Sequence, residues 1–477
     1  IYNHIKTRTM FKFRLALIFT LFIIGSAFSS KSMNTPPDST TSLVDKSSAI
    51  YMIDEGRTLF NEGKFRDALN KFREAALKDP NSWKAVYWVG QCHYTMNNYG
   101  LALKYAQDAL SNDKNSVKDE VYELLGNAHH RSSNLDSAIF YFEKLIGDLK
   151  VRVGFETGLN PGMKEYYKKI EFNLQQALFA KAEMAGTNRS AKVSLGSVNS
   201  GYNDYNPILT NEGKTLYFVS RRSDTKGGSM NPDDQEYFED TYHAVWNDAT
   251  QDWDSISNEL GRINSDGFDA VNFISKDGLN GIMTINTTAT GAKKTTKGSD
   301  LFTIDMSTKT KWSTPKRINS KSINTGFFEG SATMTADGNT MYFVSDRKGN
   351  KSSTDIYVTQ KIGKSWGEAN PLPFNVNTIS RETTPFITPD GRFLFFSSDG
   401  HPGMGGLDIY VAENKGGSWG NPINLGIMVN TVNNDTHFQY YPELKKAVMS
   451  SFEIIGQKAS MDIYQVDMSG YTLPEGK

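Results

Sequence analysis

Two repeat systems with different spacings divide this chain, and the change of spacing constrains the fold more than any other feature. Up to about residue 188, small residues recur every 34 or 36 positions; beyond residue 192, aspartates recur every 53 to 60 positions. The shorter spacing fits a pair of helices, and the longer one fits a small sheet of three to four strands. We therefore predict an α-helical repeat array followed by a β-repeat array.

The first system carries small and aromatic residues in register over three units. Small residues on a first helix allow a second helix to approach closely, and aromatic residues fill the remaining gaps. This spacing resembles the tetratricopeptide repeat, and we place that domain at residues 49–188. We expect an irregular loop at 147–160 and a capping helix from Met163 to Ala185. The repeated positions are Gly56, Gly90 and Gly126, and Ala68, Ala102 and Ala138.

The second system repeats one strand three times, at residues 216–220, 341–345 and 394–398, each after a turn that contains glycine. Five units of this kind predict a five-bladed β-propeller at residues 189–470. The units resemble the WD40-like repeats of bacterial envelope proteins. Because the aspartates and tryptophans repeat, we interpret them as structural. They are Asp240, Asp300, Asp355, Asp408 and Asp462, and Trp253, Trp312, Trp366 and Trp419.

The fifth unit stops soon after Asp462 and lacks its last strand. Residues 193–199 resemble residues 423–430 of the fourth unit. We predict that the domain's own N-terminal segment supplies the missing outer strand, which closes the ring and leaves no exposed sheet edge.

The N-terminal residues predict export. Four cations precede an apolar run from Leu15 to Ile24, and small residues follow it. This pattern indicates a signal peptide at 1–29, with an uncleaved anchor as the alternative. We expect a linker at 30–48, a tail at 471–477, no transmembrane span after cleavage, and a protein of the periplasm that can be peripheral to the outer membrane.

Residues that would carry catalysis or bind a cofactor are scarce. None of the seven histidines has metal-ligand spacing, Cys92 is the only cysteine, and no phosphate-binding or nucleophile motif occurs. We interpret His93 and His129, at equivalent repeat positions, as packing residues. With 52 basic and 53 acidic residues, the charge balance speaks against a nucleic-acid partner. We expect no cofactor, no metal and no enzymatic activity.

The variable connections of the propeller are the candidate binding face. Aromatic and charged residues on variable loops of a rigid scaffold are typical of a binding surface, although ordinary solvated loops are the alternative. The candidate partner-binding residues are Tyr202, Tyr205, Arg221, Arg222, Phe268, Phe327, Phe328, Arg347, Arg381, Glu382, His401 and His437.

The order of segments resembles a family of Gram-negative envelope proteins associated with type IX secretion and gliding. In that family a peptidoglycan-binding OmpA-like domain follows, and this sequence has none before Lys477, so it is a shorter relative or a truncated one. The resemblance implies a non-enzymatic scaffold that holds protein partners in a helical groove and on a propeller face. The alternatives are a glycan-binding propeller, with glycan or peptidoglycan association, and a glycoside hydrolase, for which Asp269, Glu329 and Glu382 are the nearest carboxylates.

Overall fold

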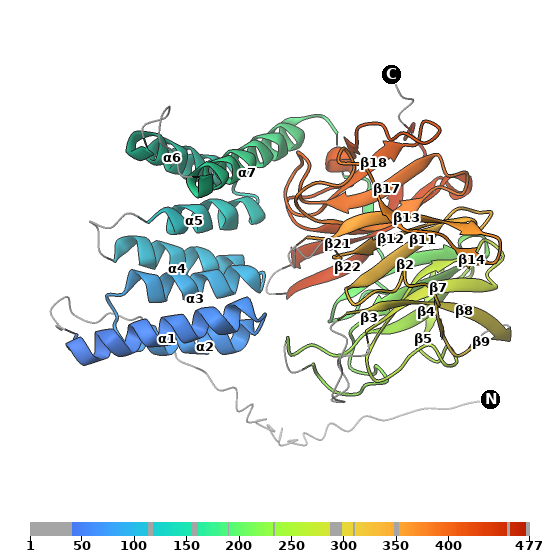
Figure 1. Cartoon of the computed structure of the whole chain (residues 1–477), viewed down its shortest axis with the longest axis horizontal. Helices are drawn as coiled ribbons and strands as arrows, with labels where there is room; N and C mark the ends of the chain where they lie inside the picture. Colours follow the sequence, from blue (N-terminus) through green and yellow to red (C-terminus); the bar gives the residue numbers. More distant parts are fainter. Residues whose placement is uncertain are drawn as a thin grey trace, which may run out of the picture. The chain divides into compact units, whose positions relative to one another are not determined.

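The computed structural model describes residues 41–112, 118–153, 161–188, 190–231, 234–286, 298–308, 311–347, 353–455 and 458–473. The expected signal peptide and most of the expected linker lie outside these residues. Within the described residues, no helix is both long and apolar enough to cross a membrane. The chain forms a helical array and then a five-bladed propeller (Figure 1).

The described part of the array contains seven helices, each packed on the next in chain order (Figure 1). The first begins at Leu43, inside the expected linker, because the Ser42 hydroxyl caps it by accepting a hydrogen bond from Asp45 N at 3.0 Å. The helices are α1 (Leu43–Asn61), α2 (Phe65–Lys78), α3 (Trp83–Thr95), α4 (Tyr99–Ser111), α5 (Asp119–Arg131), α6 (Leu135–Val153) and α7 (Pro161–Ala185).

The expected loop at 147–160 is wrong for its first seven residues, which belong to α6. Leu149 is 2% exposed and packs in one cluster with Ile170 of α7, so burial extends the helix past the repeat. Residues 154–160 lie outside the described part of the chain. The capping helix α7 was predicted to within two residues of its start.

The repeated glycines allow the two helices of a pair to pack closely. A Cβ atom on Gly56 would lie 2.6 Å from the Phe72 ring, and one on Gly126 would lie 2.4 Å from the Phe142 ring. Both glycines therefore permit an aromatic side chain of the second helix to rest on the backbone of the first. The packing interpretation of two histidines is also confirmed, because they stack on tyrosines in the same way: His93 on Tyr105 and His129 on Tyr141.

Five antiparallel sheets follow, and their first strands contact one another around a ring. These first strands are β2 (Asp204–Thr210), β6 (Phe268–Ile274), β11 (Glu329–Met334), β16 (Glu382–Ile387) and β20 (Asp435–Tyr441). The second strands are β3 (Thr215–Ser220), β7 (Asn280–Asn286), β12 (Thr340–Ser345), β17 (Phe393–Ser398) and β21 (Lys446–Ile455). The third strands are β4 (Asp240–Asn247), β8 (Asp300–Thr308), β13 (Asp355–Ile362), β18 (Asp408–Glu413) and β22 (Lys458–Asp467).

Short outer strands complete the blades. They are β5 (Asp252–Ser257), β9 (Lys311–Trp312), β10 (Lys316–Arg317), β14 (Ser365–Trp366), β15 (Asn370–Pro371) and β19 (Ile423–Asn424). The tryptophans pack between blades, as predicted: Trp312, for example, is 1% exposed and shares a cluster with Tyr217 of the first blade.

The predicted closure of the ring is confirmed. Strand β1 (Lys192–Ser194) pairs antiparallel with β22, so the fifth blade contains strands from both ends of the domain. An asparagine then binds the third strand: Ile463 N donates to Asn199 Oδ1 at 2.8 Å, and Asn199 Nδ2 donates to Ile463 O at 2.9 Å. The same two bonds recur in the other blades, at 2.7–3.0 Å, through Asn264, Asn324, Asn377 and Asn430.

The array and the propeller also share a small cluster of side chains. Leu135 and Ala180 of the array pack with Met404 and Val432 of the propeller. Beside this cluster, Arg131 Nη1 donates to Val432 O at 2.7 Å. The two repeat domains therefore have separate main cores and one shared apolar contact.

Candidate functional site

One end of the propeller, which we call the connection end, is where the first strands begin. Each first strand has a carboxylate at or next to its first residue, and all five are 0% exposed. Each accepts hydrogen bonds from the backbone N–H and the hydroxyl of the serine or threonine four residues earlier, at 2.5–2.8 Å. The pairs are Ser200 with Asp204, Ser265 with Asp269, Thr325 with Glu329, Thr378 with Glu382, and Thr431 with Asp435. This repetition in every blade indicates a structural role.

Two predicted partner-binding arginines take part in this arrangement. Arg222 lies 2.8 Å from the Asp204 carboxylate, and Arg347 lies 3.3 Å from that of Glu329. Each guanidinium also covers an aromatic ring, at 4.8 Å from Tyr242 for the first and 4.5 Å from Tyr357 for the second. Because their charged groups are paired inside the blade, these arginines offer little to a partner.

Burial changes the protonation of the acids at this end. Desolvation raises the pKa of Asp269 to about 7, that of Glu382 to about 7 and that of Asp408 to about 8. Within the described part of the chain, Oδ1 of Asp269 and Oδ1 of Asp408 have no hydrogen-bond partner. These carboxyl groups therefore keep a proton to a higher pH than an exposed carboxyl group does.

A second group of residues at the connection end breaks the five-fold repeat. Glu239 precedes the repeated aspartate of the third strand, where the other blades have Ser299, Thr354, Leu407 and Met461. Burial raises the pKa of the Glu239 carboxyl. The hydrogen bond with Tyr205 and the charge of Arg221 lower it, but by less than burial raises it. Arg221 itself lies 2.8 Å from Asp234 and 3.0 Å from Glu236. Our sequence analysis missed Glu239, although its departure from the repeat was visible there.

The structure brings five of the predicted residues to this group. The Arg221 guanidinium lies 5.5 Å from the Phe268 ring, and its Nε donates to Tyr237 O at 2.6 Å. Contacts between rings extend this group. The ring centroids of Tyr202 and Tyr237 lie 5.5 Å apart, and those of Tyr205 and His437 lie 5.7 Å apart.

The remaining predicted residues lie apart from this group. Arg381 is exposed and pairs with Asp399 at 2.7 Å, while His401 Nε2 contacts Val376 O at 2.9 Å. Phe327 is 45% exposed. Phe328 is half-buried, and its N–H donates to Asp346 at 2.8 Å. The twelve residues therefore do not form one surface.

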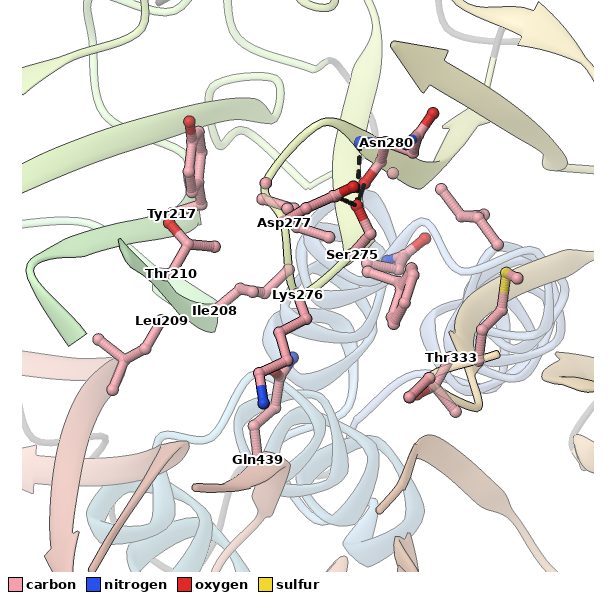
Figure 2. A pocket seen from close by; sticks show the side chains of 18 of the residues that line it. Ile208, Leu209, Thr210, Tyr217, Ser275, Lys276, Asp277, Asn280, Thr333 and Gln439 are labelled. Carbon is pink, nitrogen blue, oxygen red and sulfur yellow. Dashed lines mark hydrogen bonds between the residues drawn. The ribbon is translucent and has the colours of Figure 1, made fainter. Parts of the chain in front are cut away.

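The opposite end, which we call the hairpin end, contains the turns between first and second strands. These turns surround a cavity of about 1440 Å³ (Figure 2). All five blades contribute to it, through the turns near Glu212, Asp277, Asp337, Pro389 and Glu443. The sequence analysis placed no binding residue here.

The helical array has an inner layer formed by α1, α3, α5 and α7, which contact one another in that order. Polar residues lie along it. Asn173 Nδ2 donates to Asn127 Oδ1 at 3.1 Å, and Lys169 lies 2.5 Å from Glu123. Gln91 of α3 occupies the position equivalent to Asn127, so amide groups recur along the layer.

The tetratricopeptide repeat family matches residues 53–117. This match begins within α1 and includes α2, α3 and α4, so it covers most of the first helix pair and all of the second. No curated protein sequence matches the chain. Tetratricopeptide arrays present an extended concave surface that binds segments of other proteins, so protein or peptide binding is the function this domain indicates.

Several solved structures are similar to part of this chain. The Yersinia enterocolitica type III secretion translocator chaperone SycD is 15% identical, covering 29% of this chain and 98% of its own, with a TM-score of 0.26. PcrH, in complex with the chaperone-binding region of PopD, is 16% identical, covering 28% of this chain and 94% of its own, with a TM-score of 0.25. The first repeat domain of Spaghetti (RPAP3), bound to an HSP90 peptide, is 16% identical over 27% and 95%, with a TM-score of 0.22.

Two further observations concern chemistry. Among the residues the structure describes, no group of three or more His, Cys, Asp or Glu side chains is placed to hold a metal ion. Cys92 is fully buried, and burial raises the pKa of its thiol to about 12, so it stays protonated and unreactive in the folded array.

Proposed function

We propose that this protein is a non-enzymatic scaffold that holds a segment of a protein partner in the groove of its helical array and uses the propeller as a second binding platform. The observation that carries the proposal is the row of amide and aromatic side chains on the inner layer, which includes Tyr87, Gln91, Asn127 and Tyr166. Amides bind the backbone of an extended segment, and tyrosines supply contact area at low entropic cost.

The same proposal places the protein in the bacterial cell envelope. A basic segment followed by an apolar run at the N-terminus supports export, and the order of the two repeat domains supports a role in type IX secretion or envelope organisation. In the periplasm the scaffold would hold a partner at or near the outer membrane.

Site-specific photocrosslinking in cells tests the groove. Gln91 of α3 is replaced by p-benzoylphenylalanine, and Lys104, which is exposed on α4 of the outer layer, receives the same replacement as a control. We expect one discrete adduct from position 91 and none from position 104. Equal adducts from both positions, or none from position 91, would contradict the groove.

One specific observation favours a second function, hydrolysis of a glycan. Glu239 and Asp269 both lie at the connection end, burial raises the pKa of both, and the charge of Glu239 contributes to the rise for Asp269. A carboxyl group with a raised pKa can serve as the general acid of a glycosidase, beside a second carboxylate that acts as base or nucleophile. Cleavage of an oligosaccharide by the purified protein, abolished by Glu239→Gln, would replace the scaffold proposal with this one.

A further inference from the structure

The cavity at the hairpin end of the propeller has apolar side chains in its lining beside polar ones. Its lining includes Ile208, Ile274, Ile282 and Ile304, which are at most 8% exposed, and the rings of Tyr217 and Phe386. Its volume of about 1440 Å³ exceeds the roughly 300–1,000 Å³ of a typical small-molecule site. An elongated ligand with apolar side chains therefore fits it better than a single metabolite.

The rim of the cavity is acidic. Among the lining residues, five carboxylates (Glu212, Asp277, Asp305, Asp337 and Glu443) stand against two ammonium groups, those of Lys276 and Lys361. Hydrogen bonds from Ser275 and Thr335 lower the pKa of Asp277 and of Asp337, so both acids stay charged at neutral pH. Burial lowers the pKa of the lining His243, which adds no compensating charge.

Together with Lys316, which pairs with Asp305, the two lining lysines leave two of the five negative charges uncompensated. Lys276 lies 3.8 Å from Glu443, with both side chains exposed, and Lys361 lies 5.2 Å from the Trp366 ring. Asp305 pairs with Lys316 at 3.0 Å. A net negative field therefore remains at the mouth, where it attracts a cationic ligand.

One lining side chain is oriented to bind a peptide backbone. The Tyr441 hydroxyl accepts from Leu209 N at 2.9 Å and donates to Gln439 Oε1 at 2.8 Å. This fixes the Gln439 oxygen, so its amide N–H groups are left for the cavity that Gln439 lines, and in Figure 2 the Lys276 side chain extends toward Gln439. An amide donor beside apolar side chains suits the carbonyl of an extended chain.

We propose that the hairpin-end cavity binds an extended peptide segment of a partner protein, with lysine or arginine residues on either side of an apolar or aromatic residue. The apolar residue occupies the interior, the cations meet the acidic rim, and Gln439 donates to the backbone. This inference deepens the proposed function, because it gives the propeller a ligand class. Peptide binding at the propeller and crosslinking at the helical groove can fail independently, so the two failures are distinguishable.

Fluorescence anisotropy on the full chain tests the inference with two labelled peptides, Lys-Phe-Lys-Leu-Lys and Glu-Phe-Glu-Leu-Glu. We expect the basic peptide to bind at least about tenfold more tightly than the acidic one at low salt, with the difference shrinking as salt rises. The double variant Glu212→Lys/Glu443→Lys changes only exposed side chains and should weaken the basic peptide by about tenfold or more.

The controls separate this site from a general charge effect. Glu368→Lys makes the same change at an exposed position that does not line the cavity, and it should leave both affinities unchanged. Gln439→Met should lower the affinity for the basic peptide but leave the salt dependence of that affinity unchanged. Equal binding of both peptides, an equal loss in Glu368→Lys, or tighter binding of an N-acetylglucosamine hexamer than of the basic peptide would overturn the inference.

Discussion

At the connection end of the propeller the repeated carboxylates are buried and hydrogen-bonded inside their own blades, whereas at the hairpin end Asp277, Asp337 and Glu443 line an open cavity. Burial raises the pKa of Asp269 and of Glu382, while turn hydrogen bonds lower the pKa of Asp277 and of Asp337. The same residue type therefore stabilises the ring at one end and is available to a ligand at the other. We therefore expect substitutions at the two ends to change the free energy of unfolding by different amounts.

The largest effect is expected from the buried ion pair of the third blade. Glu329→Ala leaves Arg347 without its carboxylate and removes the acceptor of Thr325 N and of Ser345 Oγ. We expect the free energy of unfolding to fall by about 3 kcal/mol, measured by urea denaturation. Asp337→Ala at the hairpin end is the matched control, and an equal loss in both variants would remove the distinction between the ends.

The next effect concerns the closure of the ring. Asn199→Ala removes the two hydrogen bonds to the backbone of Ile463 and should cost about 2 kcal/mol of unfolding free energy. Asn339→Ala, at an exposed hairpin turn, should cost less than about 0.5 kcal/mol. If thermal melting shows the two variants to be equally stable, the asparagine is not what holds β1 to the fifth blade.

The pH dependence of stability should also differ between the ends. A folded-state pKa of about 7 for Asp269, above 3.8 when unfolded, means that the folded chain keeps a proton that the unfolded chain releases. Stability should therefore fall as pH rises from 4 to 7, and Asp269→Asn should remove the part of that fall that Asp269 contributes. The lowered pKa values of Asp277 and Asp337 act in the opposite sense, since their stabilisation is lost as pH falls below 4. Urea titrations at several pH values measure both slopes, and an unchanged slope in Asp269→Asn would contradict this assignment.

The smallest effect on stability is expected at the cavity rim. Glu212→Gln removes one exposed charge and should change the unfolding free energy by less than about 0.5 kcal/mol, while weakening the basic peptide by about threefold. Melting curves and anisotropy on the same preparation measure the two quantities. A stability loss as large as that of Asn199→Ala would show that the hairpin end is structural as well.

The repeats made the architecture predictable. Period and residue type located the helix pairs and all five blades, and the likeness of residues 193–199 to 423–430 predicted the closing strand. Boundaries were less predictable, because the Ser42 cap and the burial of Leu149 depend on contacts that no repeat position reveals.

The functional surfaces were only partly predictable. The serine or threonine four residues before each buried carboxylate was present in the sequence, and this spacing would have marked Glu382 as structural. Glu239 could have been found as the acid that interrupts the repeat. The cavity could not have been found from the sequence, because its size depends on how far apart the five hairpins lie around the axis. Packing between blades sets that distance.

The pairing of β1 with β22 has a consequence for how the propeller is made. Asn199 leaves the ribosome long before Ile463, its partner 264 residues later in the chain. Until then, the first four blades can pack on one another, but the ring cannot close. A pairing between such distant residues also forms slowly, because the connecting chain must first lose conformational entropy. The nascent chain therefore carries β1 as an unpaired strand, with a free hydrogen-bonding edge, until β22 is synthesised. A chaperone that covers this edge would act before the final blade exists and would no longer be needed once β22 docks.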